Sequence, residues 1–397
     1  MLRKILFGFA ILVFLLCAAG LFLYLRIRPR LRAIAEQEAK ERDFLQPRLV
    51  SGAGIFERRS FYVGQGLGNI SQILVGWPAD REVADIAVVA SQGADFIDST
   101  GRAKKQVRFS IQQCGPVTVA RMNSTGEYGY LTRNESWAVP ATFFDKEGRV
   151  SWHSGGRWPG IDDSVPGDVF GDGRLCVVMG LNGGGGLVLL DGQGQQLWQK
   201  AETNVWHVET LDTNGDGREE ILHSNARGQL FVRNATGDVI SQYLPGFYVS
   251  GFALTRWGDE ARATHIIVPT TEGREGCCKP IFVVLDATGK TVAKLESPPL
   301  GSSLNQIAAI PVQFGKGRRY FAVLQNSFAK ERSALLLYDN DGQIAYQEIL
   351  AETCLGMATL PGIDANQFLV GCASKIWQYS PVPQVSGAKK ASTPQAH

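Results

Sequence analysis

A short loop with oxygen-bearing side chains at alternate positions is the strongest candidate for chemistry in this sequence. In the segment DTNGDGREE, residues 212–220, such side chains stand at positions one, three and five. In a tight turn this spacing wraps oxygen atoms around a hard cation, and calcium prefers ligands of this kind. We therefore predict one structural calcium ion, held by side chains of Asp212, Asn214, Asp216 and Glu220 and by the main-chain carbonyl of Arg218.

The calcium loop differs from an EF-hand, because His223 stands at position twelve and no helices are expected beside it. A metal-free turn between two strands is the alternative. An earlier loop retains Asp168 and Asp172 but has Phe170 at the third position and Cys176 at the ninth. We expect that loop to hold no ion.

Four cysteines are disulfide candidates. If the chain turns back around PGIDAN, antiparallel pairing brings Cys354 opposite Cys372, close enough for a bridge. Cys277 and Cys278 are adjacent, and they are either a vicinal disulfide or two free thiols in a loop. Two buried thiols are the alternative for the first pair.

A recurring turn predicts how these candidate sites are positioned. Each copy has Asp or Asn followed three residues later by Gly, between two short apolar runs, which is typical of a β-hairpin. The glycines recur at intervals of 43 to 53 residues, at Gly101, Gly148, Gly194, Gly237, Gly289 and Gly342. The same interval holds a second turn and another apolar strand, so we expect four short strands per repeat.

Four-stranded antiparallel sheets at this period predict an all-β fold, a seven-bladed β-propeller. Six hairpins mark six blades, and residues 354–380 supply three strands of a seventh. The segment RRSFYVG, residues 58–64, is expected to complete that blade and so close the ring. Closure removes exposed sheet edges that would recruit other chains.

The N-terminal segment predicts a membrane anchor. Residues 5–25 carry no charge, and 21 helical residues rise about 30 Å, the thickness of a bilayer core. A cleaved secretory signal is the alternative. We expect a transmembrane anchor over 1–28, a helical stalk over 29–50, the propeller over 55–380 and a disordered tail over 381–397.

The segments GDVFGDGR and LDTNGDGREEIL, at 167–174 and 211–222, resemble repeats of the FG-GAP or VCBS family. That resemblance implies the propeller of integrin α-subunit heads. The hairpin LLDGQGQQLWQK, at 189–200, is also similar to repeats of pyrroloquinoline-quinone-type propellers. Both resemblances imply the same architecture, and they differ in the chemistry that they imply.

We expect a membrane-anchored binding or scaffold module whose propeller face binds a protein or a glycan. A propeller enzyme, either a quinoprotein dehydrogenase or a polysaccharide-active protein, is the alternative. The formal charge of +2, without a basic run, argues against nucleic acid as a partner. The basic residues after the apolar segment favour a cytoplasmic propeller, whereas the short N-terminal tail and six further cysteines favour an extracytoplasmic one, which we predict.

Overall fold

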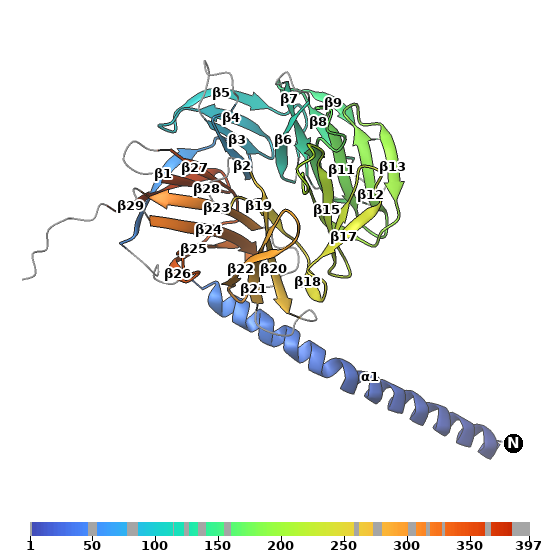
Figure 1. Ribbon diagram of the computed structural model, residues 1–397. Helices are drawn as coiled ribbons and strands as arrows, with labels where there is room; N and C mark the ends of the chain where they lie inside the picture. Colours follow the sequence, from blue (N-terminus) through green and yellow to red (C-terminus); the bar gives the residue numbers. More distant parts are fainter. Residues whose placement is uncertain are drawn as a thin grey trace, which may run out of the picture.

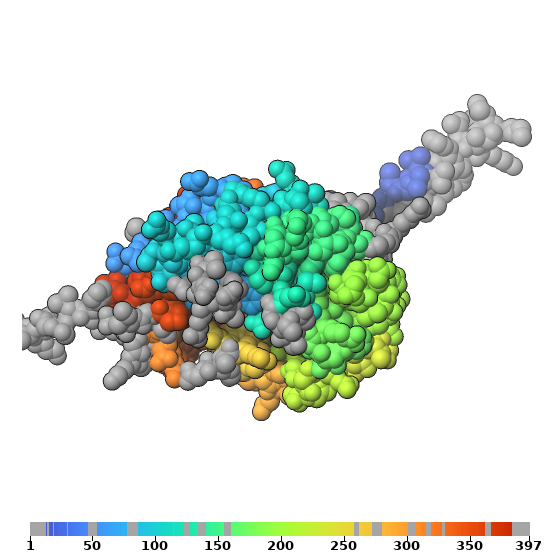
Figure 2. All heavy atoms as spheres, turned by 90° about the horizontal axis from the view of Figure 1, so that it is seen from above, coloured from blue at the N-terminus to red at the C-terminus, as the bar shows by residue number. Residues whose placement is uncertain are grey.

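The chain forms a ring of seven antiparallel sheets from which one long helix projects (Figure 1). Figure 2 shows the succession of sheets on the surface, from cyan through green and yellow to orange and red. The computed structural model describes residues 2–46, 54–77, 86–113, 115–122, 127–133, 140–154, 160–257, 262–272, 280–300, 307–314, 318–327, 330–361 and 367–382. The predicted seven-bladed propeller is confirmed in these residues.

The first four blades each contain four strands in chain order. Blade 1 contains β2 (Ile70–Val75), β3 (Ile86–Ala90), β4 (Gly93–Ile97) and β5 (Ala103–Arg108). Blade 2 contains β6 (Val117–Arg121), β7 (Tyr128–Thr132), β8 (Thr142–Phe144) and β9 (Val150–His153). Blade 3 contains β10 (Ile161–Gly167), β11 (Cys176–Leu181), β12 (Gly186–Asp191) and β13 (Gln196–Lys200). Blade 4 contains β14 (Val205–Leu211), β15 (Glu220–Asn225), β16 (Leu230–Arg233) and β17 (Val239–Tyr243).

The last three blades vary this plan. Blade 5 contains β18 (Phe247–Val249), β20 (His265–Glu272), β21 (Pro280–Asp286) and β22 (Thr291–Glu296), and β19 (Ala253–Thr255) also pairs with β20. Blade 6 contains β23 (Ile307–Phe314), β24 (Arg318–Ser327), β25 (Arg332–Tyr338) and β26 (Ile344–Leu350). Blade 7 contains β27 (Cys354–Leu360), β28 (Gln367–Cys372), β29 (Lys375–Pro381) and β1 (Phe56–Val63).

The N-terminal strand closes the ring, as the sequence predicts. β1 pairs antiparallel with β29, with Phe56 opposite Pro381 and Val63 opposite Lys375. Arg58 of β1 forms an ion pair with Glu348 of β26 and lies over the ring of Trp377, 4.5 Å from its centroid. The closing strand therefore binds two blades through side chains as well as through the backbone.

Packing between neighbouring sheets forms the core. Each of seven buried clusters combines side chains of two adjacent blades; one joins blades 1 and 2, and another joins blades 7 and 1. Both faces of the middle strands are covered, so β3, β4 and β11 are buried along their whole length. This explains why the middle strands have continuous apolar sequences instead of alternating ones.

The six repeated turns close their hairpins by one mechanism. The side chain of the leading Asp or Asn accepts hydrogen bonds from the backbone N–H groups two and four residues later, as Asp191 does at 2.9 and 2.8 Å. The glycine adopts positive φ, 78° at Gly194, and a β-bulge follows it. Only a residue without a Cβ adopts this conformation at little cost.

Helix α1 (Leu2–Phe44) ends on the propeller. Phe44 and Leu45 are buried against Leu300 and Ala334. The Arg332 guanidinium donates to the Leu45 carbonyl at 2.7 Å. The expected division into an anchor over 1–28 and a stalk over 29–50 therefore falls within one continuous helix, which passes through Pro29 without a break.

Within the described part of the chain, no helix combines the length and the apolar character needed to cross a membrane. This finding gives no support to the transmembrane span predicted over 5–25, of which residues 5–12, 14, 15 and 19 have side chains outside the described part. The segment 383–397, most of the expected tail, also lies outside it.

Candidate functional site

The predicted calcium loop connects β14 to β15. Asp212 turns its carboxylate into the loop, where Oδ1 accepts hydrogen bonds from the backbone N–H groups of Asn214 and Gly215 at 3.3 and 2.7 Å. Its Oδ2 accepts another from Gly217 at 3.0 Å. Asp212 thus holds the loop in its folded shape through three backbone hydrogen bonds.

The other predicted ligand side chains converge on Asn214. The Asn214 amide lies 3.2 Å from Asp216 Oδ2 and 3.4 Å from Glu220 Oε1. Glu220 is buried at the start of β15, where its Oε2 accepts from the backbone N–H and hydroxyl of Thr213. The structure therefore brings three predicted side chains together, with the Asn214 amide nitrogen donating to the two carboxylates.

The loop is further held by hydrogen bonds of Arg218 and by a contact with the neighbouring loop of blade 3. The Arg218 backbone N–H donates to Asp216 Oδ1 at 2.8 Å. Glu219 joins the loop to the equivalent loop of blade 3, because its backbone N–H donates to the Asp168 carbonyl at 3.1 Å. Among the residues that the structure describes, no group of three His, Cys, Asp or Glu side chains is arranged to hold a metal ion. The predicted ligand set also includes Asn214, which is not one of these four residue types, and the calcium ion stays a prediction.

Two of the four candidate cysteines lie in described residues. Cys354 and Cys372 are opposite each other in the pairing of β27 with β28, and a disulfide joins them. Cys277 and Cys278 lie outside the described residues. Cys176 is a buried free thiol whose pKa is raised to about 11, mainly by burial.

A cluster of one buried and three partly buried polar side chains joins blades 2, 3 and 4, and no motif in the sequence predicts it. The Arg133 guanidinium donates twice to Asp163, both at 2.9 Å, and once to Glu209 at 3.1 Å. His207 Nδ1 lies 2.6 Å from Asp163 Oδ2. Burial favours the neutral form of Asp163, but the charges of Arg133 and His207 outweigh it and lower the pKa to about 2. These four side chains come from three blades and contact one another, so we interpret the cluster as a link between blades.

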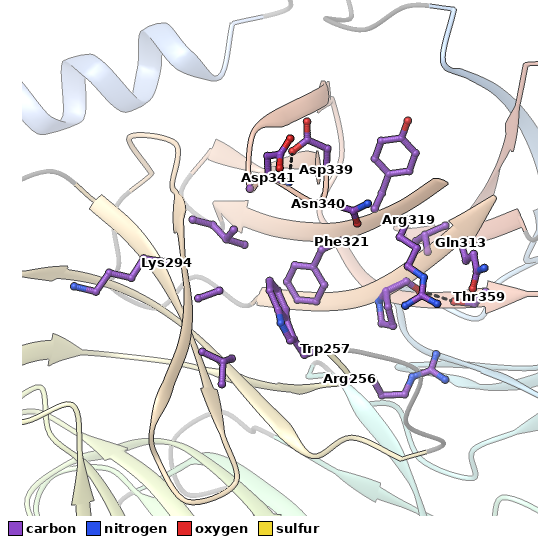
Figure 3. Close-up of a pocket in the computed structure, with 17 residues that line it drawn as sticks. Arg256, Trp257, Lys294, Gln313, Arg319, Phe321, Asp339, Asn340, Asp341 and Thr359 are labelled. Carbon is purple, nitrogen blue, oxygen red and sulfur yellow. Dashed lines mark hydrogen bonds between the residues drawn. The ribbon is translucent and has the colours of Figure 1, made fainter. Parts of the chain in front are cut away.

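A groove of about 650 Å³ opens between blades 5 and 6. Figure 3 shows Arg256, Arg319, Gln313 and Thr359 gathered towards one end, with Asp339, Asn340 and Asp341 at the other. Trp257 and Phe321 lie between the two ends, with ring centroids 4.7 Å apart at a steep angle. The groove therefore offers cations, amide and hydroxyl groups and an aromatic wall in one space.

The groove and helix α1 lie at opposite ends of the blade 6 strands. α1 contacts Ser327 and Arg332, where β24 ends and β25 begins. The groove contacts Arg319 near the start of β24, and the hairpin between β25 and β26. A ligand in the groove therefore does not compete with α1 for the same surface.

Comparisons with known proteins support the fold alone. No protein-family model matches the chain, and no curated protein matches it in sequence. The solved structure of BBS1N in complex with ARL6DN is 11% identical and has a TM-score of 0.51, with 86% of this chain and 99% of that chain covered.

Two further solved structures are similar at lower scores. BamB from Moraxella catarrhalis is 13% identical, with a TM-score of 0.44 and coverage of 83% of this chain and 99% of that one. The Pan2 WD40 domain of Neurospora crassa is 9% identical, with a TM-score of 0.47 and coverage of 84% and 97%. The resemblance to FG-GAP or VCBS repeats and to quinone-type propellers stays a prediction.

Proposed function

We propose that this chain is a membrane-anchored scaffold whose propeller binds a partner and holds it near the bilayer. The observation that carries the proposal is the docking of α1 on blade 6. The Ser327 hydroxyl donates to Glu41 at 2.6 Å, and the Gln37 amide donates to the Pro299 carbonyl at 3.0 Å. Helix and ring are therefore joined by buried and polar contacts, and whatever holds the helix also fixes the position of the ring.

The anchor is the N-terminal part of α1 in this proposal. Its support is the uncharged segment 5–25 and the direction of the helix, which leads away from the blades (Figure 1). A helix of 43 residues is about 65 Å long, enough to enter a bilayer and still keep the ring clear of it.

The propeller lies outside the cytoplasm in this proposal. Its support is the disulfide between Cys354 and Cys372, because structural disulfides persist in oxidising compartments. The partner is a protein or a glycan, and the groove between blades 5 and 6 is its candidate site.

A fractionation experiment tests the anchor and the compartment together. We expect the full chain to stay with membranes in alkaline carbonate, and protease added to intact cells to degrade the propeller. A chain without residues 5–25 should be released. Recovery of the full chain in the soluble fraction would contradict the membrane anchor. Protection of the propeller until the cells are opened would show that it lies in the cytoplasm.

We also propose that the loop at Asp212 binds calcium, which stabilises blade 4. The discriminating variant is Asp216→Asn, because an asparagine oxygen can still accept from the Arg218 N–H while the loop loses one negative charge. We expect this variant to melt several degrees below the parent in millimolar calcium and within about one degree of it in chelator. The same difference in both buffers would show that the loop holds no stabilising ion.

A further inference from the structure

In blades 2 and 3, the residue seven positions after the hairpin Asp is a tryptophan that contacts the next blade. In blade 2 this residue is Trp152, which donates to the Gly192 carbonyl of the next hairpin at 3.0 Å. In blade 3 it is Trp198, which donates to the Ala235 carbonyl at 2.9 Å. In blade 5 the corresponding residue is Ala293, seven positions after Asp286.

Of the six hairpin glycines, the one at the junction between blades 5 and 6 has the most space beside it. A Cβ placed on five of the hairpin glycines would meet another atom within 2.2 to 2.8 Å. At Gly342, the hairpin glycine of blade 6, the nearest atom is Leu295 Cδ2 at 3.3 Å. The groove is lined by Ala293, at the position where blades 2 and 3 have a tryptophan.

The outer strand of blade 5 presents its backbone to the groove. Val292, Ala293, Lys294 and Leu295 all line it. Successive side chains of a strand point to opposite faces of the sheet. Because four consecutive residues of β22 line the groove, the backbone edge of this strand lies in the groove. Among the described strands β22 pairs only with β21, and Val292 is 40% exposed on this edge. An extended chain can add to such an edge through backbone hydrogen bonds.

The charged side chains of the groove indicate which kind of extended chain it binds. Arg256 and Arg319 lie towards the same end, beside the Gln313 amide (Figure 3). Guanidinium groups match carboxylates in charge and in geometry. The Asp339 carboxylate at the other end already accepts from the backbone N–H groups of Asp341 and Gln343, so it serves the hairpin.

We propose that this groove binds an extended acidic segment of a partner protein. The segment adds to the edge of β22, places an apolar side chain beside Ala293, and directs its carboxylates to Arg256 and Arg319. This inference rests on the proposed scaffold function and names the class of ligand.

The test uses the full chain in detergent and a fluorescent octapeptide that alternates Glu or Asp with Val and Phe. The control peptide has every carboxylate replaced by its amide. We expect fluorescence anisotropy to show saturable binding of the acidic peptide and at least tenfold weaker binding of its amide control. Arg256→Gln should weaken binding severalfold and reduce its dependence on salt.

A pair of variants at one position separates the groove from the rest of the surface. Ala293→Trp introduces the side chain that blades 2 and 3 carry, so we expect a folded protein whose affinity for the acidic peptide falls at least tenfold. Ala293→Ser keeps the space open and should bind within twofold of the parent. Equal binding by both variants, or no binding of the acidic peptide at 1 mM, would overturn the inference. So would displacement of the peptide by a uronic-acid oligosaccharide that binds more tightly.

Photocrosslinking in intact cells distinguishes failure of this inference from failure of the scaffold function. The crosslinker p-benzoylphenylalanine replaces Val292 in one chain and Leu197, on the outer strand of blade 3, in another. We expect a crosslinked protein from position 292 whose attached peptide is acidic. Crosslinking from position 197 alone would overturn the groove assignment and leave the scaffold function, and crosslinking from neither position would contradict both.

Discussion

The buried histidine of blade 4 shows how one residue sets a pH limit on the fold. His223 is fully buried in β15, and its Nε2 accepts from Arg233 Nε at 2.9 Å. Arg233 is itself paired with Glu202 at 2.8 Å. Burial, and then the charge of Arg233, lower the pKa of His223 to about 3. The ring is therefore neutral in the folded protein at every pH near neutrality.

We predict that stability falls as the pH drops below about 6.5, the ordinary pKa of histidine in an unfolded chain. Between that value and about 3, the unfolded chain binds a proton that the folded protein excludes. The loss at pH 5 should be about 2 kcal/mol, measured by urea unfolding at pH 7.5 and 5.

Two matched variants test this prediction, one at the buried His223 and one at the exposed His153. His223→Gln keeps an acceptor for Arg233 without a titrating ring, so its stability should change less between these pH values. His153→Gln alters an exposed ring and should retain the parent's pH dependence. A parent that is equally stable at both pH values would contradict the assignment.

At the scale of the element, each hairpin is a contact between blades as well as a turn. Gly194 has a φ of +78°, and a Cβ there would lie 2.7 Å from the ring of Trp152 in the preceding blade. Gly184 has a φ of +81°, with no atom within 4 Å of such a Cβ. The two glycines thus share a backbone conformation and differ in their surroundings.

We predict that Gly184→Ala costs about 1 kcal/mol, the price of a left-handed alanine. Gly194→Ala should cost roughly 2 to 4 kcal/mol, because the new methyl group also displaces the Trp152 ring. Chemical denaturation of both variants measures the difference. Equal costs would mean that the indole adapts freely, and that the hairpin does not fix the spacing between blades 2 and 3.

At the scale of the whole molecule, some features could be predicted from sequence and others could not. The hairpins are local, so their Asp-to-Gly spacing predicts their positions and the repeat. The charged cluster of Arg133, Asp163 and Glu209 unites three blades, and no local pattern places these residues together. The hairpin sequences place Ala293 at the position of Trp198, but the groove is also lined by residues of blade 6, which this comparison does not reveal. The docking of α1 depends on contacts between residues more than 250 positions apart.

Closure of the ring by β1 is a property of the whole molecule, and it can be tested by truncation. A chain that begins at residue 54 loses the packing of Phe44 and Leu45 but keeps β1, so we expect it to fold and melt a few degrees lower. A chain that begins at residue 66 loses β1, which exposes the edge of β29 and leaves buried Glu348 without Arg58. An open edge recruits other chains, and a buried charge without its partner is costly.

We therefore predict that the shorter chain aggregates or loses cooperative unfolding, as size-exclusion chromatography and thermal melts will show. A synthetic peptide of residues 54–65, added in trans, should restore a single cooperative transition because it supplies the missing strand. The same peptide with Arg58→Ala should restore it less well, since it pairs with β29 but leaves Glu348 unneutralised. A chain from residue 66 that melts within two degrees of the chain from residue 54 would show that six complete blades and three strands are stable without closure.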